Sequence, residues 1–227
     1  MANALRVTLE ASPKGKRVVA VAPDWPGLER GAPSAEAALT RLSAYLPRYA
    51  PVAKLAGMGA PFAALSTAGV EVVASYPGTG STDFWGISFA FSPIDQQPMS
   101  GETLERDLTL LRACWTFFDE ARARVSAEMR KGPRGGGRDR DRIVQHTLAT
   151  EWDWAAKLGV RAPEDALLTS EGLRAHRDAY LDAIRAFHAQ GKPARSWPLR
   201  YLIRHTAFHT LDHAWEMEDK DLTAGRA

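Results

Sequence analysis

Cysteine is almost absent from this chain, because its 227 residues include only one, Cys114. A single thiol cannot form an intramolecular disulfide, so the sequence excludes a disulfide framework and fits a reducing compartment. Cys114 lies in the apolar helical stretch LLRACWTFFDE, which predicts a buried and unreactive thiol rather than a nucleophile. We therefore expect a cytoplasmic protein.

Long apolar runs and an excess of charge of one sign are missing as well. No run approaches the roughly 20 apolar residues that a membrane-spanning helix needs. The opening segment MANALRVTLEASPKGK has no apolar core after its basic residues, so we expect no signal peptide. The formal net charge is only +2. This balance predicts neither nucleic acid nor membrane as a partner, and we expect a small-molecule substrate instead.

The first part of the chain has the patterns of strands around a helix. Residues 5–11 alternate apolar and polar side chains, and residues 17–23 follow as a hairpin partner. Ser34 is a predicted N-cap for a helix over 35–46. Further predictions are strands over 69–77 and 84–93, a Pro- and Gly-rich loop over 24–34, and an ambiguous stretch over 51–67 with room for a short second helix.

The second part has helical periodicity. Four helices are predicted, over 100–129, 141–159, 169–191 and 197–219. We therefore predict an α+β fold, with a small α/β domain over 1–95, a helical bundle over 99–222 and a boundary between Phe91 and Gly101.

Histidine is sparse, with six residues, yet His205, His209 and His213 recur at four-residue spacing. On a helix these rings share one side. Imidazoles one turn apart can reach the same metal ion, but two helical ligands do not complete a site. His146, in the apolar stretch IVQHTLATEWDW, is the best candidate for the third ligand. A hydrogen-bonded core role remains the alternative, and His205 is the member for which it is strongest.

The sequence offers further candidate residues besides these four histidines. His176 and His188 have charged and small neighbours, so we expect them on the surface. Either Asp212 or Glu216 is expected to orient a ligand ring. Trp152, Trp154 and Trp215 are candidate pocket walls, and Arg200 and Arg204 are candidate partners of a substrate carboxylate. The alternative is that the tryptophans are core residues and the arginines surface or ion-pairing residues.

Three neutral imidazoles suit a divalent transition metal, with Zn, Ni or Fe as the expected cofactor. Three protein ligands leave a position for water or substrate, which is typical of catalytic rather than structural sites. We expect metal affinity to weaken below about pH 6, where protons compete for an unperturbed imidazole.

Two stretches resemble known families. VVAVAPDWPGLERGAPSAEAALTRLSAYL is similar to the HicB-like small α/β domain, found in antitoxins and in many scaffolds, which implies a fold more than a function. The segments TLLRACWTFFDEARARV, DRIVQHTLATEWDW and WPLRYLIRHTAFHTLDHAWEMEDK resemble the DinB/YfiT-like four-helix metal-binding superfamily.

The second resemblance implies His146, His209 and His213 as metal ligands, and it leaves a His205/His209 pair open. Some members of that superfamily are thiol-dependent S-transferases that use mycothiol or bacillithiol, and one is a maleylpyruvate isomerase. The resemblance therefore implies a metal-dependent transferase or hydrolase, a low-molecular-weight thiol as partner and a homodimer. The alternative is a non-catalytic regulatory or structural metal-binding protein with a HicB-like interaction module.

Overall fold

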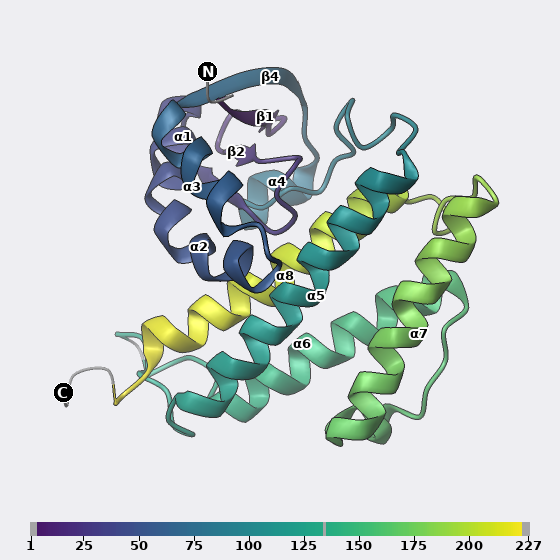
Figure 1. Ribbon diagram of the computed structural model, residues 1–227. Coiled ribbons are helices and arrows are strands. Elements are labelled where there is room, and N and C mark those ends of the chain that lie inside the picture. Colours follow the sequence, from purple (N-terminus) through teal and green to yellow (C-terminus); the bar gives the residue numbers. More distant parts are fainter. Residues whose placement is uncertain (1–3, 134, 224–227) are drawn as a thin grey trace.

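A four-stranded sheet and a group of long helices lie side by side in the computed structural model, which describes residues 4–133 and 135–223 (Figure 1). The fold is mixed α+β. The strands come from the first third of the chain, and the long helices follow after residue 100. The last strand ends at Pro77, and the first long helix begins at Gly101.

The sheet has the strand order β3-β2-β1-β4. β1 (Leu5–Ala11) and β2 (Val18–Val21) form an antiparallel hairpin, and β3 (Glu29–Ala32) extends it on the far side of β2. β4 (Val70–Pro77) lies parallel to β1 at the other edge. A parallel neighbour requires a crossover connection, and three short helices between β3 and β4 supply it.

These crossover helices are α1 (Ala35–Ala44), α2 (Leu46–Leu55) and α3 (Gly59–Ala68), and α4 (Gly80–Trp85) follows the last strand. The Ser34 hydroxyl accepts a hydrogen bond from the backbone N–H of Ala37, which satisfies one of the free donors at the start of α1. The predicted N-cap is therefore confirmed.

The long helices are α5 (Gly101–Arg124), α6 (Arg140–Ala155), α7 (Ser170–Ala189) and α8 (Leu199–Lys220). Short 3₁₀ segments, η1 (Ala156–Leu158) and η2 (Glu164–Leu168), lie between α6 and α7. α8 runs beside α5 and also packs on α6 (Figure 1). α8 thus lies between the sheet side of the molecule and α6.

The loop before β3 enters the core that the two parts share. Trp25 and Leu28 are buried, and one hydrophobic cluster joins them to side chains of α2, α5 and α8. Gly27 brings the loop backbone against α8, where a Cβ added to Gly27 would lie 2.7 Å from Leu211 Cδ1 and 3.2 Å from the Ala207 carbonyl group. The predicted α/β and helical segments therefore bury their apolar faces against each other.

Two predictions about the first part of the chain are wrong. Residues 24–34, predicted as loop, contain β3. The ambiguous stretch over 51–67 does hold a short helix, α3, together with the end of α2. Residues 84–93, predicted as a strand, contain the end of α4 and no strand. The physical reason is that the backbone N–H groups of this segment donate to buried carboxylates: Ser88 to Glu29, and Phe89 and Ala90 to Glu10.

No helix in the described parts of the chain combines the length and the apolar character needed to cross a membrane.

We predict that Gly27→Ala destabilises the fold more than Gly15→Ala does. Both glycines have positive φ, 93° and 65°, so alanine is strained at either position, by about 1–2 kcal/mol. Only Gly27 faces close neighbours, since nothing lies within 4 Å of a Cβ at Gly15. Overpacking should add about 1–3 kcal/mol at Gly27. Urea unfolding of both variants measures the difference, and equal losses would contradict the close approach of the loop to α8.

Candidate metal centre

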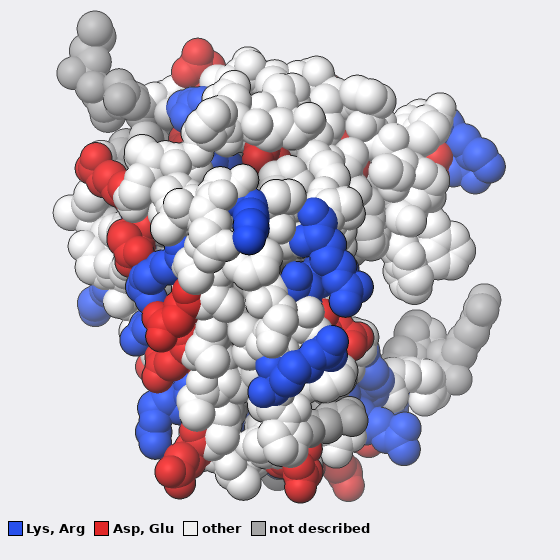
Figure 2. All heavy atoms as spheres, turned by 90° about the vertical axis from the view of Figure 1, so that its right-hand side faces the viewer, with Lys and Arg blue, Asp and Glu red and all other residues white. Residues whose placement is uncertain are grey.

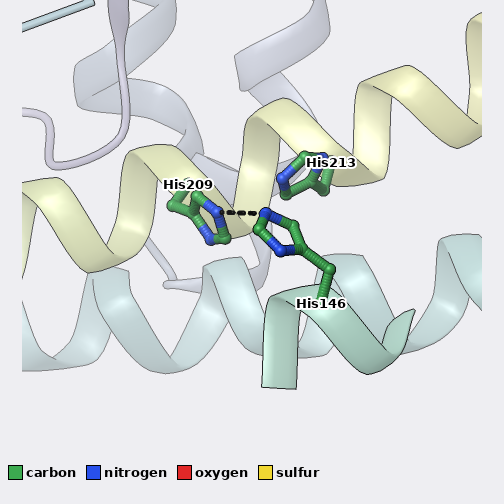
Figure 3. Close-up of side chains that lie close together, drawn as sticks. All are labelled: His146, His209 and His213. Atoms are coloured by element: carbon green, nitrogen blue, oxygen red, sulfur yellow. Dashed lines mark hydrogen bonds between the residues drawn. The ribbon is translucent and has the colours of Figure 1, made fainter. Parts of the chain in front are cut away.

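The structure brings His146, His209 and His213 together between α6 and α8. His209 and His213 lie one turn apart on α8, and His146 reaches them from α6 (Figure 3). One ring nitrogen from each residue lies within 4.8 Å of the other two. The Nε2 atoms of His146 and His209 are 3.3 Å apart. The three residues predicted as ligands therefore form one cluster.

Burial disfavours the protonated form of two of these rings. It lowers the pKa of His209 to about 2, and the neighbouring His213 and His146 act in the same direction. Burial followed by His213 also lowers the pKa of His146. The ring of Trp154 lies against His209, with centroids 5.3 Å apart, and shields it from water. Neutral imidazole is the form that binds metal, so protons compete at these two rings only below the pH of about 6 expected for unperturbed histidine.

Glu216 fixes the tautomer of His213. Its Oε2 lies 2.7 Å from His213 Nδ1, and because a carboxylate only accepts, Nδ1 carries the proton and the lone pair is on Nε2. Burial alone would raise the pKa of Glu216, but hydrogen bonds from His213 and Lys220 lower it to about 2. Arg138 also donates to this carboxylate. Glu216 is therefore an ionised acceptor that holds one ring of the cluster in place.

The cluster fits a divalent transition metal. Two nitrogen ligands at about 2.0–2.1 Å from a tetrahedral ion lie about 3.3 Å apart, and this is the separation of the His146 and His209 Nε2 atoms. A carboxylate behind a ligand imidazole, as Glu216 is behind His213, is the usual second partner in metal sites. No cysteine approaches the cluster among the described residues, since Cys114 is buried in α5.

His205 lies outside this cluster. Its ring is stacked on Tyr201, with centroids 5.0 Å apart, and it also contacts Trp154, Trp197 and Phe89. Burial lowers its pKa to about 3, so it is a neutral ring within an aromatic cage. The geometry thus favours His209 and His213 over the alternative His205/His209 pair.

Arg204, the residue before His205, is fully buried and holds α8 against the sheet side of the molecule. Its guanidinium donates to both carboxylate oxygens of Asp95, at 2.9 and 2.7 Å, and to Glu29 at 3.2 Å. Burial raises the pKa of Glu29 to about 7, although Arg204 opposes this shift. Since the histidines follow on the same helix, this ion cluster helps to fix the rotation of α8 that directs them towards α6.

Other sequence predictions have mixed outcomes. Cys114 is buried, and burial raises its pKa, as expected of an unreactive thiol. His176, predicted at the surface, is only 2% exposed, because it lies on the inner side of α7. His188 is half-buried, with Nε2 2.7 Å from the Met99 carbonyl oxygen. The surface prediction is therefore wrong for His176 and incomplete for His188.

The acidic and arginine side chains predicted near the site have different roles in the structure. Asp212 is half exposed and pairs with Arg30 at 3.5 Å, so of the two acids only Glu216 bonds to a ligand ring. Arg204 is committed to Asp95 and Glu29, which takes it away from a substrate. Arg200 is half-buried in the first turn of α8.

The three tryptophans predicted as pocket walls also differ in their contacts. Trp154 contacts His209, whereas Trp152 donates its Nε1–H to the Ala162 carbonyl oxygen. Trp215 lies in the core beside Tyr45 and Arg30. Of the three, Trp154 is thus the one against a ring of the histidine cluster.

Sequence reasoning missed Arg138. It belongs to the glycine- and arginine-rich stretch KGPRGGGRDRDR, whose composition indicates a solvated connector. In the structure it reaches Glu216 at 3.2 Å, and its charge contributes to the lowered pKa of His146 and His209. No local signal pairs it with a residue 78 positions later in the chain.

Comparison of the chain with protein-family models, with curated proteins and with solved structures finds no match.

We predict that Arg204→Ala costs about 3–5 kcal/mol of stability, because it leaves Asp95 and Glu29 buried without their cation. Arg185→Ala is the matched control. Arg185 also donates to both oxygens of one carboxylate, that of Glu105, but at an exposed position, where such a pair contributes only about 0–1 kcal/mol. Chemical denaturation compares the two, and a small loss for Arg204→Ala would refute its role in holding α8.

Proposed function

We propose that this protein is a metal-dependent enzyme in which His146, His209 and His213 bind a divalent transition metal, Zn, Ni or Fe. The observation that carries the proposal is the convergence of three ring nitrogens within 4.8 Å from two helices, with Glu216 behind one ring. Three neutral nitrogen ligands suit these metals and leave a coordination position for a substrate.

The chain's own residues prepare the site. Glu216 orients His213, and Trp154 keeps water from one side of His209. Lys220 and Arg138 hold the Glu216 carboxylate, so it is not free to bind the ion itself. A divalent ion in such a site supplies Lewis acidity and lowers the pKa of a coordinated water or thiol.

We favour a thiol-dependent S-transferase or a hydrolase of the DinB-like type, with the HicB-like segment as an accessory module. The support is the order of the histidines, one on the second long helix and a pair late in the fourth, together with the motifs quoted above. A low-molecular-weight thiol is the proposed co-substrate. In an S-transfer step, its sulfur forms a bond to an electrophilic carbon, and the leaving group departs with the electron pair of the bond that breaks.

Nucleic acid, which the sequence does not predict as a partner, finds no support as one on the face that includes α7. Acidic and basic side chains are interspersed there, and Figure 2 shows no continuous basic surface on this side. Ion pairs such as Arg112–Asp178 and Arg185–Glu105 account for part of this mixture. A non-catalytic metal-binding protein remains the second candidate, and a thiol-transfer assay on the metal-loaded protein separates it from the enzyme.

We predict that His209→Ala removes most of the metal, because its nitrogen lies beside both other ligands. Metal affinity should fall by more than about 100-fold, which exceeds the loss typical of an outer-shell change. Metal content of freshly purified protein, with competitive Zn²⁺ titration, measures the effect. His205→Ala is the control and should retain metal, since that ring lies in the aromatic cage. Full occupancy in His209→Ala would end the proposal.

We also predict that Glu216→Gln weakens Zn²⁺ binding by about 10–100-fold, because the amide no longer offers His213 Nδ1–H an ionised acceptor. Asp212→Asn, one residue from His213 on the same helix, should leave the affinity unchanged, since Asp212 pairs with Arg30 instead. The same titration compares them. If both variants lose affinity equally, the effect is one of net charge, and the specific role of Glu216 is refuted.

A further inference from the structure

A cavity of about 720 Å³ adjoins the histidine cluster, and His146 is part of its wall. One side is a stripe of α6 formed by Arg142, Gln145, Ala149 and Trp152, which follow one another at helical spacing. The other side is η2, with Leu167, Leu168 and Asp165. The volume falls in the range of small-molecule sites.

The apolar wall of this cavity is held in place by specific contacts. Trp152 Nε1 donates to the Ala162 carbonyl oxygen at 2.8 Å and so ties the segment before η2 to α6. Leu148 and Leu167 are buried in one small cluster, and Trp152 packs against it. Leu168, which also lines the cavity, is 66% exposed. The site thus offers apolar surface to a ligand.

Three exposed polar side chains of its wall have no partner among the described residues. Within residues 4–133 and 135–223, Arg142, Gln145 and Asp165 make no side-chain hydrogen bond or ion pair, although Arg142 acts on Asp139 over a longer distance. Arg142 and Gln145 are three residues apart on α6, and His146 follows. Two hydrogen-bond donors are therefore available beside the exposed edge of the histidine cluster.

The surrounding charge favours an anion. Arg142 is four residues before His146 on α6, so this cation lies one helical turn from the histidine cluster, and the charge of Arg138 also acts on His146. Asp165, the acid among the residues that line the cavity, lies on η2, in the opposite wall. A cation at the end of the cavity next to the cluster attracts an anion to that end.

We propose that this cavity binds a small organic carboxylate, with its apolar body against Trp152 and the leucines and its carboxylate on Arg142 and Gln145. Bound there, the ligand touches the ring of His146 and is presented to the histidine centre as its second substrate. The link to that centre rests on the metal binding proposed above, whereas the binding of the anion does not.

The test uses phenylacetate and its uncharged isostere phenylacetamide, titrated calorimetrically into chelator-treated, metal-free protein. Phenylacetate should bind at least about tenfold tighter than the amide, and Arg142→Gln should abolish that preference. Arg140→Gln is the matched control, since Arg140 is on the same helix but pairs with Asp141 outside the cavity. Asp165→Asn should tighten the binding of phenylacetate.

Equal binding of acid and amide, or an unchanged preference in Arg142→Gln, would overturn the proposal. So would tighter binding of phenethylamine, a cation that only Asp165 could recognise. A second arm adds phenylacetate to Co²⁺-loaded protein, where contact with His146 should shift the visible bands. If phenylacetate binds the metal-free protein but no Co²⁺ is taken up, the carboxylate site stands and the proposed metal function fails. If Co²⁺ binds and phenylacetate does not, the reverse holds.

Discussion

The buried ion cluster around Arg204 is the interaction on which the arrangement of the molecule depends. It joins α8 to β3 through Glu29 and to the segment before α5 through Asp95. Glu10 of β1 ties the same segment to the sheet, because it accepts hydrogen bonds from Ser88, Phe89 and Ala90. Buried charges are costly unless they are paired, so this network tolerates few alternative positions of α8. The helix that bears two of the clustered histidines is fixed accordingly.

Apolar packing and this polar network have different roles. Burial of Trp25, Leu28, Tyr49 and Leu211 supplies the non-directional attraction that brings α8 to the sheet side. Attraction of this kind does not by itself select one rotation of a helix. The fork of the Arg204 guanidinium does, since it matches the two oxygens of Asp95 in one orientation. The rotation of α8 sets the positions of His209 and His213. Glu216 then fixes the orientation of the His213 ring through its hydrogen bond to Nδ1.

Local signals in the sequence predicted much of the fold and the histidine cluster. Ser34 caps α1 as expected, and the four-residue spacing of His209 and His213 placed them on one side of a helix. The errors come from long-range polar contacts. The segment over 84–93 has the composition of a strand, but its backbone donors go to Glu10 and Glu29. His176 has polar neighbours in sequence, yet α7 turns it inward. Nothing within a short window reveals such partners.

The separation of Glu29 and Arg204 by 175 residues has a consequence for how the chain is made. During synthesis the sheet, the loop at Gly27 and α5 all emerge before α8 does. Until then Glu29 and Asp95 have no cation, and the loop around Gly27 lacks the contacts that α8 makes with it. The earlier part of the chain is therefore unable to complete its core until α8 has been synthesised. Until then it exposes apolar surface, a state in which holding chaperones act.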